Sequence, residues 1–132
     1  MKKIKGYIFS RPFMGERVPQ HVQNIVIRDY CSKKKMQYLL SASEYKMKNC
    51  YLILEDLASN MRSFNGIAVY SLFQMPENNV IRNKILKKIL KKKKSIFFAV
   101  EQIEVKNYKD IKKIDTLIKI KKKLPYCKNY EI

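Results

Sequence analysis

The sequence is poor in the residues that build metal sites and disulfide scaffolds. Its 132 residues include one histidine, His21, and three cysteines, of which no two have the spacing of a zinc-binding pair. These counts disfavour a Cys/His metal cluster, and the odd number of cysteines disfavours a disulfide framework. We therefore expect a protein of a reducing, cytoplasmic environment that carries no metal ion and no cofactor.

Long apolar runs are also absent from the sequence. No stretch approaches the roughly 18 apolar residues that a membrane span requires. The first lysines lead into a strand-like segment and not into the apolar part of a signal peptide. Apolar residues still make up 46% of the chain and charged residues 30%, which is the balance of a globular domain without a membrane span.

Acidic residues are scarce, with 11 Asp and Glu against 29 Lys and Arg, and the net charge is +18. A charge of this size attracts polyanions such as nucleic acids. The excess is lysine, however, gathered in runs at residues 33–35, 91–94 and 121–123, whereas phosphate sites favour the planar fork of arginine. Because lysine, isoleucine and asparagine share A/T-rich codons, a bias of the genome accounts for the runs, and we do not expect a nucleic-acid partner.

Strand-like and helical patterns alternate along the chain. Apolar runs predict strands over residues 3–10, 36–40, 67–72 and 95–100, with a polar turn over residues 41–44. Apolar periodicity predicts a helix with Pro19 in its first turn that ends at the lysines 33–35, then helices over residues 50–62 and 78–93. A last helix carries Ile111, Ile114 and Ile118 and stops at Pro125.

This alternation predicts right-handed βαβ units, because near-continuously apolar strands suit a parallel sheet covered on both faces. We expect one α/β domain over residues 1–104, with three α/β/α layers and a mostly parallel sheet of four strands. Residues 105–132 are expected to form a C-terminal helix and tail that pack on this domain or trail from it.

Polar residues gather after the predicted strands, where ligands bind in open parallel sheets. Two arginines before a helix N-terminus, Arg11 and Arg17, predict an anion site, unless Arg11 merely pairs with Glu16 or Glu44. His21 and Glu44 are the candidates for proton transfer. The alternatives are a backbone hydrogen bond for His21 and a counter-ion role for Glu44. The remaining candidates for ligand contact are Ser10, Ser43, Tyr70 and Gln74.

The loop after the first strand carries a resemblance. The stretch Gly6–Asn24, with Ser10-Arg11-Pro12-Phe13-Met14-Gly15-Glu16-Arg17-Val18-Pro19-Gln20-His21 at its centre, resembles the sporadic carbohydrate cluster protein family, as do residues 38–45 and 68–76. The resemblance covers roughly residues 5–104. It implies a place in bacterial gene clusters for surface polysaccharide, such as lipopolysaccharide O-antigen, and names a pathway more than a reaction.

A weaker resemblance, at the level of the fold, is to the catalytic domain of serine recombinases of the resolvase type. Those domains open with a strand that reads G-Y-x-R-x-S and carry a second arginine cluster after a later strand. Here Gly6 and Tyr7 fit, but Phe9 replaces the arginine, Ser10 comes one residue early, and residues 71–77 replace the cluster. The resemblance implies a resolvase-like fold, with a flavodoxin-like fold as the alternative, but not strand-exchange chemistry.

The leading hypothesis is a protein of bacterial surface-carbohydrate biosynthesis that binds or processes an anionic sugar, as a sugar phosphate or nucleotide-sugar. The sequence leaves open whether the protein is an enzyme or a non-catalytic accessory subunit that works with other carbohydrate-biosynthesis enzymes, and whether it is a homo-oligomer. A recombinase-like nucleic-acid-binding domain is the alternative from another class.

Overall fold

The computed structural model describes residues 1–13, 17–47 and 49–127, except for the side chains of residues 122–127. Within these ranges one sheet has the strand order β2-β1-β4-β5-β6, and β3 also pairs with β1. All pairings are parallel except that between β5 and β6. The strands are β1 (Lys3–Ile8), β2 (Gln37–Tyr38), β3 (Ala42–Ser43), β4 (Gly66–Val69), β5 (Ser95–Phe98) and β6 (Ile103–Val105).

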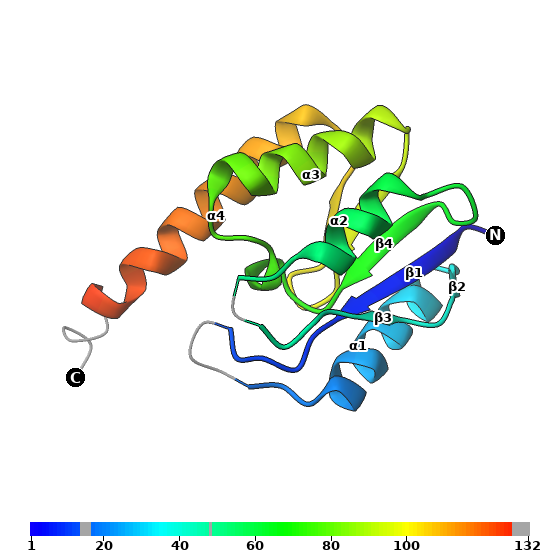
Figure 1. Ribbon diagram of the computed structural model, residues 1–132, viewed down its shortest axis with the longest axis horizontal. Coiled ribbons are helices and arrows are strands. Elements are labelled where there is room, and N and C mark those ends of the chain that lie inside the picture. The colour runs from blue at the N-terminus through cyan, green and yellow to red at the C-terminus, as the bar shows by residue number, and fades with distance from the viewer. Residues whose placement is uncertain (14–16, 48, 128–132) are drawn as a thin grey trace.

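Helices cover both faces of the sheet, which gives the three layers that the alternating pattern predicts (Figure 1). The helices are α1 (Gln20–Lys33), α2 (Leu52–Ser59), α3 (Asn79–Lys91) and α4 (Tyr108–Cys127), with a short 3-10 turn, η1 (Leu72–Gln74). Successive residues of β1 point to opposite faces. Ile8 packs with Ile27 of α1, while Tyr7 packs in the larger core that α2, α3 and α4 cover.

Two strands differ from the expected sheet of four. Residues 42–43, predicted as part of a turn, form β3, because Tyr7 and Ile8 of β1 pair with them beyond the point where β2 ends. The antiparallel strand β6 was not predicted, since Gln102 makes the tight turn before it with a positive φ of 56°, in place of a glycine that would have marked it.

Other boundaries shift by a few residues. Strand β1 stops at Ile8, and α2 is shorter than the predicted helix over residues 50–62. Pro19 is the N-cap of α1 and not part of its first turn. Helix α4 continues two residues beyond Pro125. A proline so close to a helix end removes one backbone donor without interrupting a long run of hydrogen bonds.

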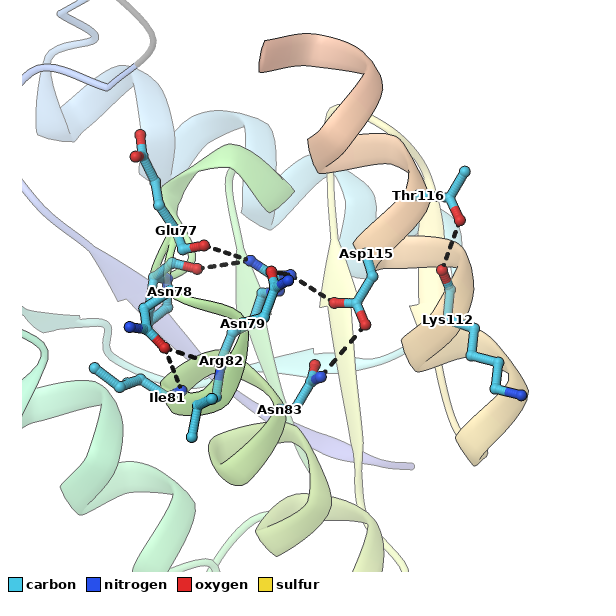
Figure 2. A network of polar contacts seen from close by, with 11 residues as sticks. Glu77, Asn78, Asn79, Ile81, Arg82, Asn83, Lys112, Asp115 and Thr116 are labelled. Carbon is cyan, nitrogen blue, oxygen red and sulfur yellow. Dashed lines mark hydrogen bonds and ion pairs between the residues drawn. The ribbon is translucent and has the colours of Figure 1, made fainter. Parts of the chain in front are cut away.

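Helix α4 is fixed to α3 by a buried arginine. The fully buried guanidinium of Arg82 donates to the carbonyls of Pro76 and Glu77, at 3.0 and 3.2 Å, and forms an ion pair with Asp115 at 2.5 Å. Figure 2 shows this guanidinium between the start of α3 and Asp115 of α4. Breaking such a pair leaves an uncompensated buried charge, so the contact specifies how α4 docks.

The topology opens a crevice at the carboxyl end of β1. The chain leaves β1 through α1 to reach β2 on one side, whereas α2 leads from β3 to β4 on the other side of β1. Because α1, which follows β1, and α3, which follows β4, lie on opposite faces, the loops after β1 and β4 diverge. Ligands of open α/β sheets bind at such a point, where the strand order reverses.

Candidate functional site

Two depressions border the loop that follows β1. The first, which we call the α1 depression, has a volume of about 380 Å³ and is lined by Ser10, Arg17, Val18, Pro19, Gln20 and Lys46. The second, which we call the aromatic depression, has a volume of about 160 Å³ and is lined by Phe9, Arg11, Pro12, Phe13, Asn49, Tyr51, Phe73, Met75 and Glu77. Of the predicted candidates, Ser10 and Arg17 line the α1 depression and Arg11 lines the aromatic depression.

The α1 depression has a positively charged lining. Arg17 and Lys46 line it, and none of the described lining residues is acidic. The first N–H groups of a helix have no partner inside the helix. Among the described residues no side chain accepts from these N–H groups of α1, and its first turn holds no acidic residue. Two cations, free N–H groups and the positive end of the helix dipole together favour an anion.

Arg11 does not belong to the α1 depression. Its Nη1 donates to the carbonyls of Tyr45 and Met47, at 3.1 and 2.9 Å. The guanidinium carbon lies 4.5 Å from the centre of the Phe9 ring and 4.8 Å from that of Tyr51. The alternative ion pair between Arg11 and Glu44 does not form; Glu16, the other predicted partner, lies outside the described residues.

Glu44 is buried, and donors surround its carboxylate. Oε1 accepts hydrogen bonds from the Tyr7 hydroxyl, at 2.9 Å, and from the N–H of Leu54. Oε2 accepts from the N–H groups of Tyr45 and Ile53, both at 3.1 Å. Since Ile53 and Leu54 lie in the first turn of α2, Glu44 acts as the cap of that helix. This role accounts for the buried charge without a ligand.

The carboxylate also affects the neighbouring tyrosine. Burial raises the pKa of Tyr7 above the ordinary value of 10.0, and the negative charge of Glu44 and its hydrogen bond raise that pKa further. The Tyr7 hydroxyl therefore stays protonated and remains a donor to Glu44.

Gln74 lies in a second buried network. Its Nε2 donates to Oε1 of Gln23 at 2.9 Å, and its Oε1 accepts from the N–H of Ser71. Gln23, also fully buried, donates to the carbonyls of Phe9 and Val18. Glu101 closes the network by accepting from the Ser71 hydroxyl and from the N–H of Leu72. These side chains join the loops after β1, β4 and β5.

The other predicted residues are scattered around the crevice. His21 is exposed in the first turn of α1, and Ser43 is exposed on the edge strand β3. The half-buried Tyr70 packs its ring edge-on against Phe13, with 6.2 Å between the ring centres. Of the eight predicted site residues, the structure brings only Ser10 and Arg17 into the α1 depression.

Lys46 is the site residue that the sequence did not reveal. It lies between the two residues whose carbonyls bind Arg11, and it reaches the α1 depression from the loop before α2. One lysine among many carries no signal in a chain of this composition. Its position just after Glu44, at the carboxyl edge of the sheet, was the available hint.

The described residues lack two further features. They hold no group of three or more His, Cys, Asp or Glu side chains that could bind a metal ion. Their helices include none with the length and apolar character that crossing a membrane demands.

Comparisons with known proteins identify the fold but no family. No protein-family model and no curated protein matches the chain. A resolvase family site-specific recombinase from Streptococcus pneumoniae is similar in structure, with a TM-score of 0.61 and 13% identity over 97% of this chain and 94% of that one. The N-terminal catalytic domain of TP901-1 integrase matches with a TM-score of 0.55 and 14% identity, over 96% and 97%. The chain therefore has the α/β fold of a resolvase-type catalytic domain, with a mostly parallel sheet and four helices among the described residues.

Proposed function

We propose that this protein binds an anionic sugar intermediate of bacterial surface-carbohydrate synthesis, a sugar phosphate or nucleotide-sugar, through its phosphate group. The observation that carries the proposal is the α1 depression, where Arg17 and Lys46 border the start of α1, which no described side chain caps. A phosphate there accepts hydrogen bonds from backbone N–H groups and from both cations, and Ser10 adds a hydroxyl.

The carbohydrate part of the proposal rests on the resemblance of residues 6–24 to the sporadic carbohydrate cluster protein family. That segment includes five of the six residues that line the α1 depression. Electrostatics favours an anion in this place, and the resemblance favours a sugar as the group that carries it.

We place binding before catalysis in this proposal. Both oxygens of Glu44 are engaged in capping α2, so this carboxylate is not free to act as a general base. His21, exposed in the first turn of α1, is then the candidate for proton transfer. An accessory subunit that delivers or senses a phosphorylated sugar fits this arrangement better than an enzyme.

A recombinase-like domain is the second candidate, and the shared fold favours it. The residues at the catalytic positions disfavour this candidate. Phe9 stands where a recombinase has an arginine, and its side chain is 2% exposed and packs in the core. Fold alone does not transfer chemistry.

The test is calorimetric titration of the purified protein with glucose 1-phosphate, UDP-glucose and glucose. We expect the two phosphorylated compounds to bind and glucose not to bind. Arg17→Ala should weaken binding about tenfold, the loss of one charge-assisted hydrogen bond. Arg62→Ala is the matched control, because Arg62 lines a separate depression with Ser59, Met61, Lys92 and Lys94.

Equal affinities of the Arg17→Ala and Arg62→Ala variants would contradict the proposal. Titration with a short DNA duplex at several salt concentrations distinguishes the recombinase-like domain from the proposed sugar-phosphate-binding protein. Micromolar duplex binding near physiological salt, falling steeply as salt rises, would favour a nucleic-acid function instead.

A further inference from the structure

Arg11 is the side chain that binds the backbone carbonyls on both sides of Lys46. The segment 45–47 has two further hydrogen bonds, from the N–H of Tyr45 to Glu44 Oε2 at 3.1 Å and from the N–H of Cys50 to the carbonyl of Met47 at 3.2 Å. Nη1 of Arg11 donates to the carbonyl oxygens of Tyr45 and Met47, the residues on either side of Lys46. Lys46 itself lines the α1 depression, whereas Arg11 lines the aromatic depression. One guanidinium therefore fixes the backbone on both sides of a lysine that faces the other site.

The guanidinium of Arg11 is itself immobilised. The rings of Phe9 and Tyr51 lie within 4.8 Å of its central carbon, and Phe9 is rigid because it is buried in the core. Cation–π contacts of this kind stabilise a cation that has lost water. Nη1 is engaged by two carbonyl oxygens, and Nη2 is buried and has no hydrogen-bond partner among the described residues, so the guanidinium is directed away from the α1 depression, which Arg11 does not line.

We propose that Arg11 is a positioning residue that sets Lys46 beside Arg17 and Ser10, and does not itself bind the anion. This inference rests on the proposed function, since it assigns a role within the same phosphate site. The expected pair of anion-binding residues was Arg11 and Arg17. In this proposal the pair is Arg17 and Lys46. Arg11 lowers the entropy that Lys46 would lose on binding, because its backbone is already fixed.

A double-mutant cycle tests the inference with glucose 1-phosphate and inorganic phosphate as probes. Lys46→Met should weaken binding about tenfold, and Arg11→Met should weaken it several-fold although Arg11 does not touch the anion. In the Lys46→Met background, Arg11→Met should change affinity by less than about twofold, because its effect passes through Lys46. Arg62→Met controls for the loss of one positive charge.

A second measurement tests, without any ligand, whether Arg11 orders the backbone of residues 45–47. Hydrogen exchange of a peptide that spans residues 45–47 should be faster in Arg11→Met than in the unchanged protein, and unaltered in Lys46→Met. Arg11→Gln, which keeps an amide donor, is measured in parallel and carries the cycle if Arg11→Met does not fold.

The outcomes distinguish failure of the positioning role of Arg11 from failure of the proposed phosphate site. Additive losses in the cycle would overturn the positioning role while leaving the proposed phosphate site in place. Unchanged exchange at residues 45–47 would overturn it in the same way. If neither Lys46→Met nor Arg17→Ala changes the affinity for the probes, the proposed function and the positioning role both fail.

Discussion

Helices α1 and α2 begin at the same edge of the sheet, yet their N-termini are treated in opposite ways. The first turn of α2 receives the buried carboxylate of Glu44, which accepts from Ile53 and Leu54. The first turn of α1 receives no side-chain acceptor from the part of the chain that the structure describes, and Arg17 and Lys46 line the depression beside it. One helix end is neutralised from within, and the other is left positive.

This contrast separates a carboxylate with a structural role from the proposed anion site, although both consist of polar residues that follow a strand in the sequence. A helix N-terminus needs an acceptor for its free N–H groups. Where the protein supplies one, as at α2, the polar cluster stabilises the fold. Where cations surround the open end, as at α1, the acceptor is expected to come from a ligand.

The largest expected effect comes from removing the internal acceptor. Glu44→Ala should lower the free energy of unfolding by about 3 kcal/mol, because buried donors of Tyr7, Ile53 and Leu54 lose their partner. Urea denaturation measures the loss. Glu55→Ala is the control, since this exposed glutamate lies in the same first turn and should cost below roughly 1 kcal/mol. Similar losses for both variants would contradict the capping role.

A smaller effect is expected at Tyr7. Tyr7→Phe should cost about 1.5 kcal/mol at neutral pH, because one donor to a buried carboxylate is lost. The pKa of Tyr7 is raised in the folded state, so only the unfolded chain loses this proton as the pH rises above the ordinary value of 10.0. Folding stability contributed by Tyr7 is therefore full below that pH and declines above it.

The pH dependence of the stability difference between the unchanged protein and Tyr7→Phe provides an internal control. Because Phe carries no titrating hydroxyl, the difference in stability between the unchanged protein and Tyr7→Phe should shrink above pH 10 in denaturation curves. A gap that stays constant up to pH 11 would show that Tyr7 ionises equally in both states.

The smallest effect on stability is expected from closing the open helix. Gln20→Glu places a carboxylate in the first turn of α1 and should raise the free energy of unfolding by about 0.5 kcal/mol. The same change should weaken glucose 1-phosphate binding several-fold, since the new charge repels the anion. Gln37→Glu, on the exposed edge strand β2, is the control. Unchanged binding in Gln20→Glu would remove the contrast between the two helices.

The sequence was sufficient for the layers of the fold but not for its short strands. Apolar runs such as residues 67–69 and 96–98 are buried on both faces, and they predicted β4 and β5 correctly. The strands β3 and β6 are two and three residues long and take their structure from pairing with β1 and β5. Pairing between distant residues leaves no local pattern, so these strands were missed.

The site was only partly predictable for a similar reason. Arg17 and Ser10 could be located because they flank a strand end and a helix start. Glu44 fits a catalytic carboxylate in the sequence, and only the structure shows that N–H groups nine and ten residues later take up its oxygens. Arg11 differs from Arg17 only through the aromatic rings around it, which come from separate segments.

The ends of the sheet have a consequence for how the protein behaves at high concentration. An exposed edge strand offers unpaired backbone groups to other chains and is a hazard for aggregation. Here one edge is divided between β2 and β3, each two residues long, and the other edge is β6, which has three residues. Edge strands this short offer few unpaired backbone N–H and C=O groups with which a strand of a neighbouring chain could pair. A basic, isoleucine-rich chain can therefore keep an open sheet without inviting edge-to-edge assembly.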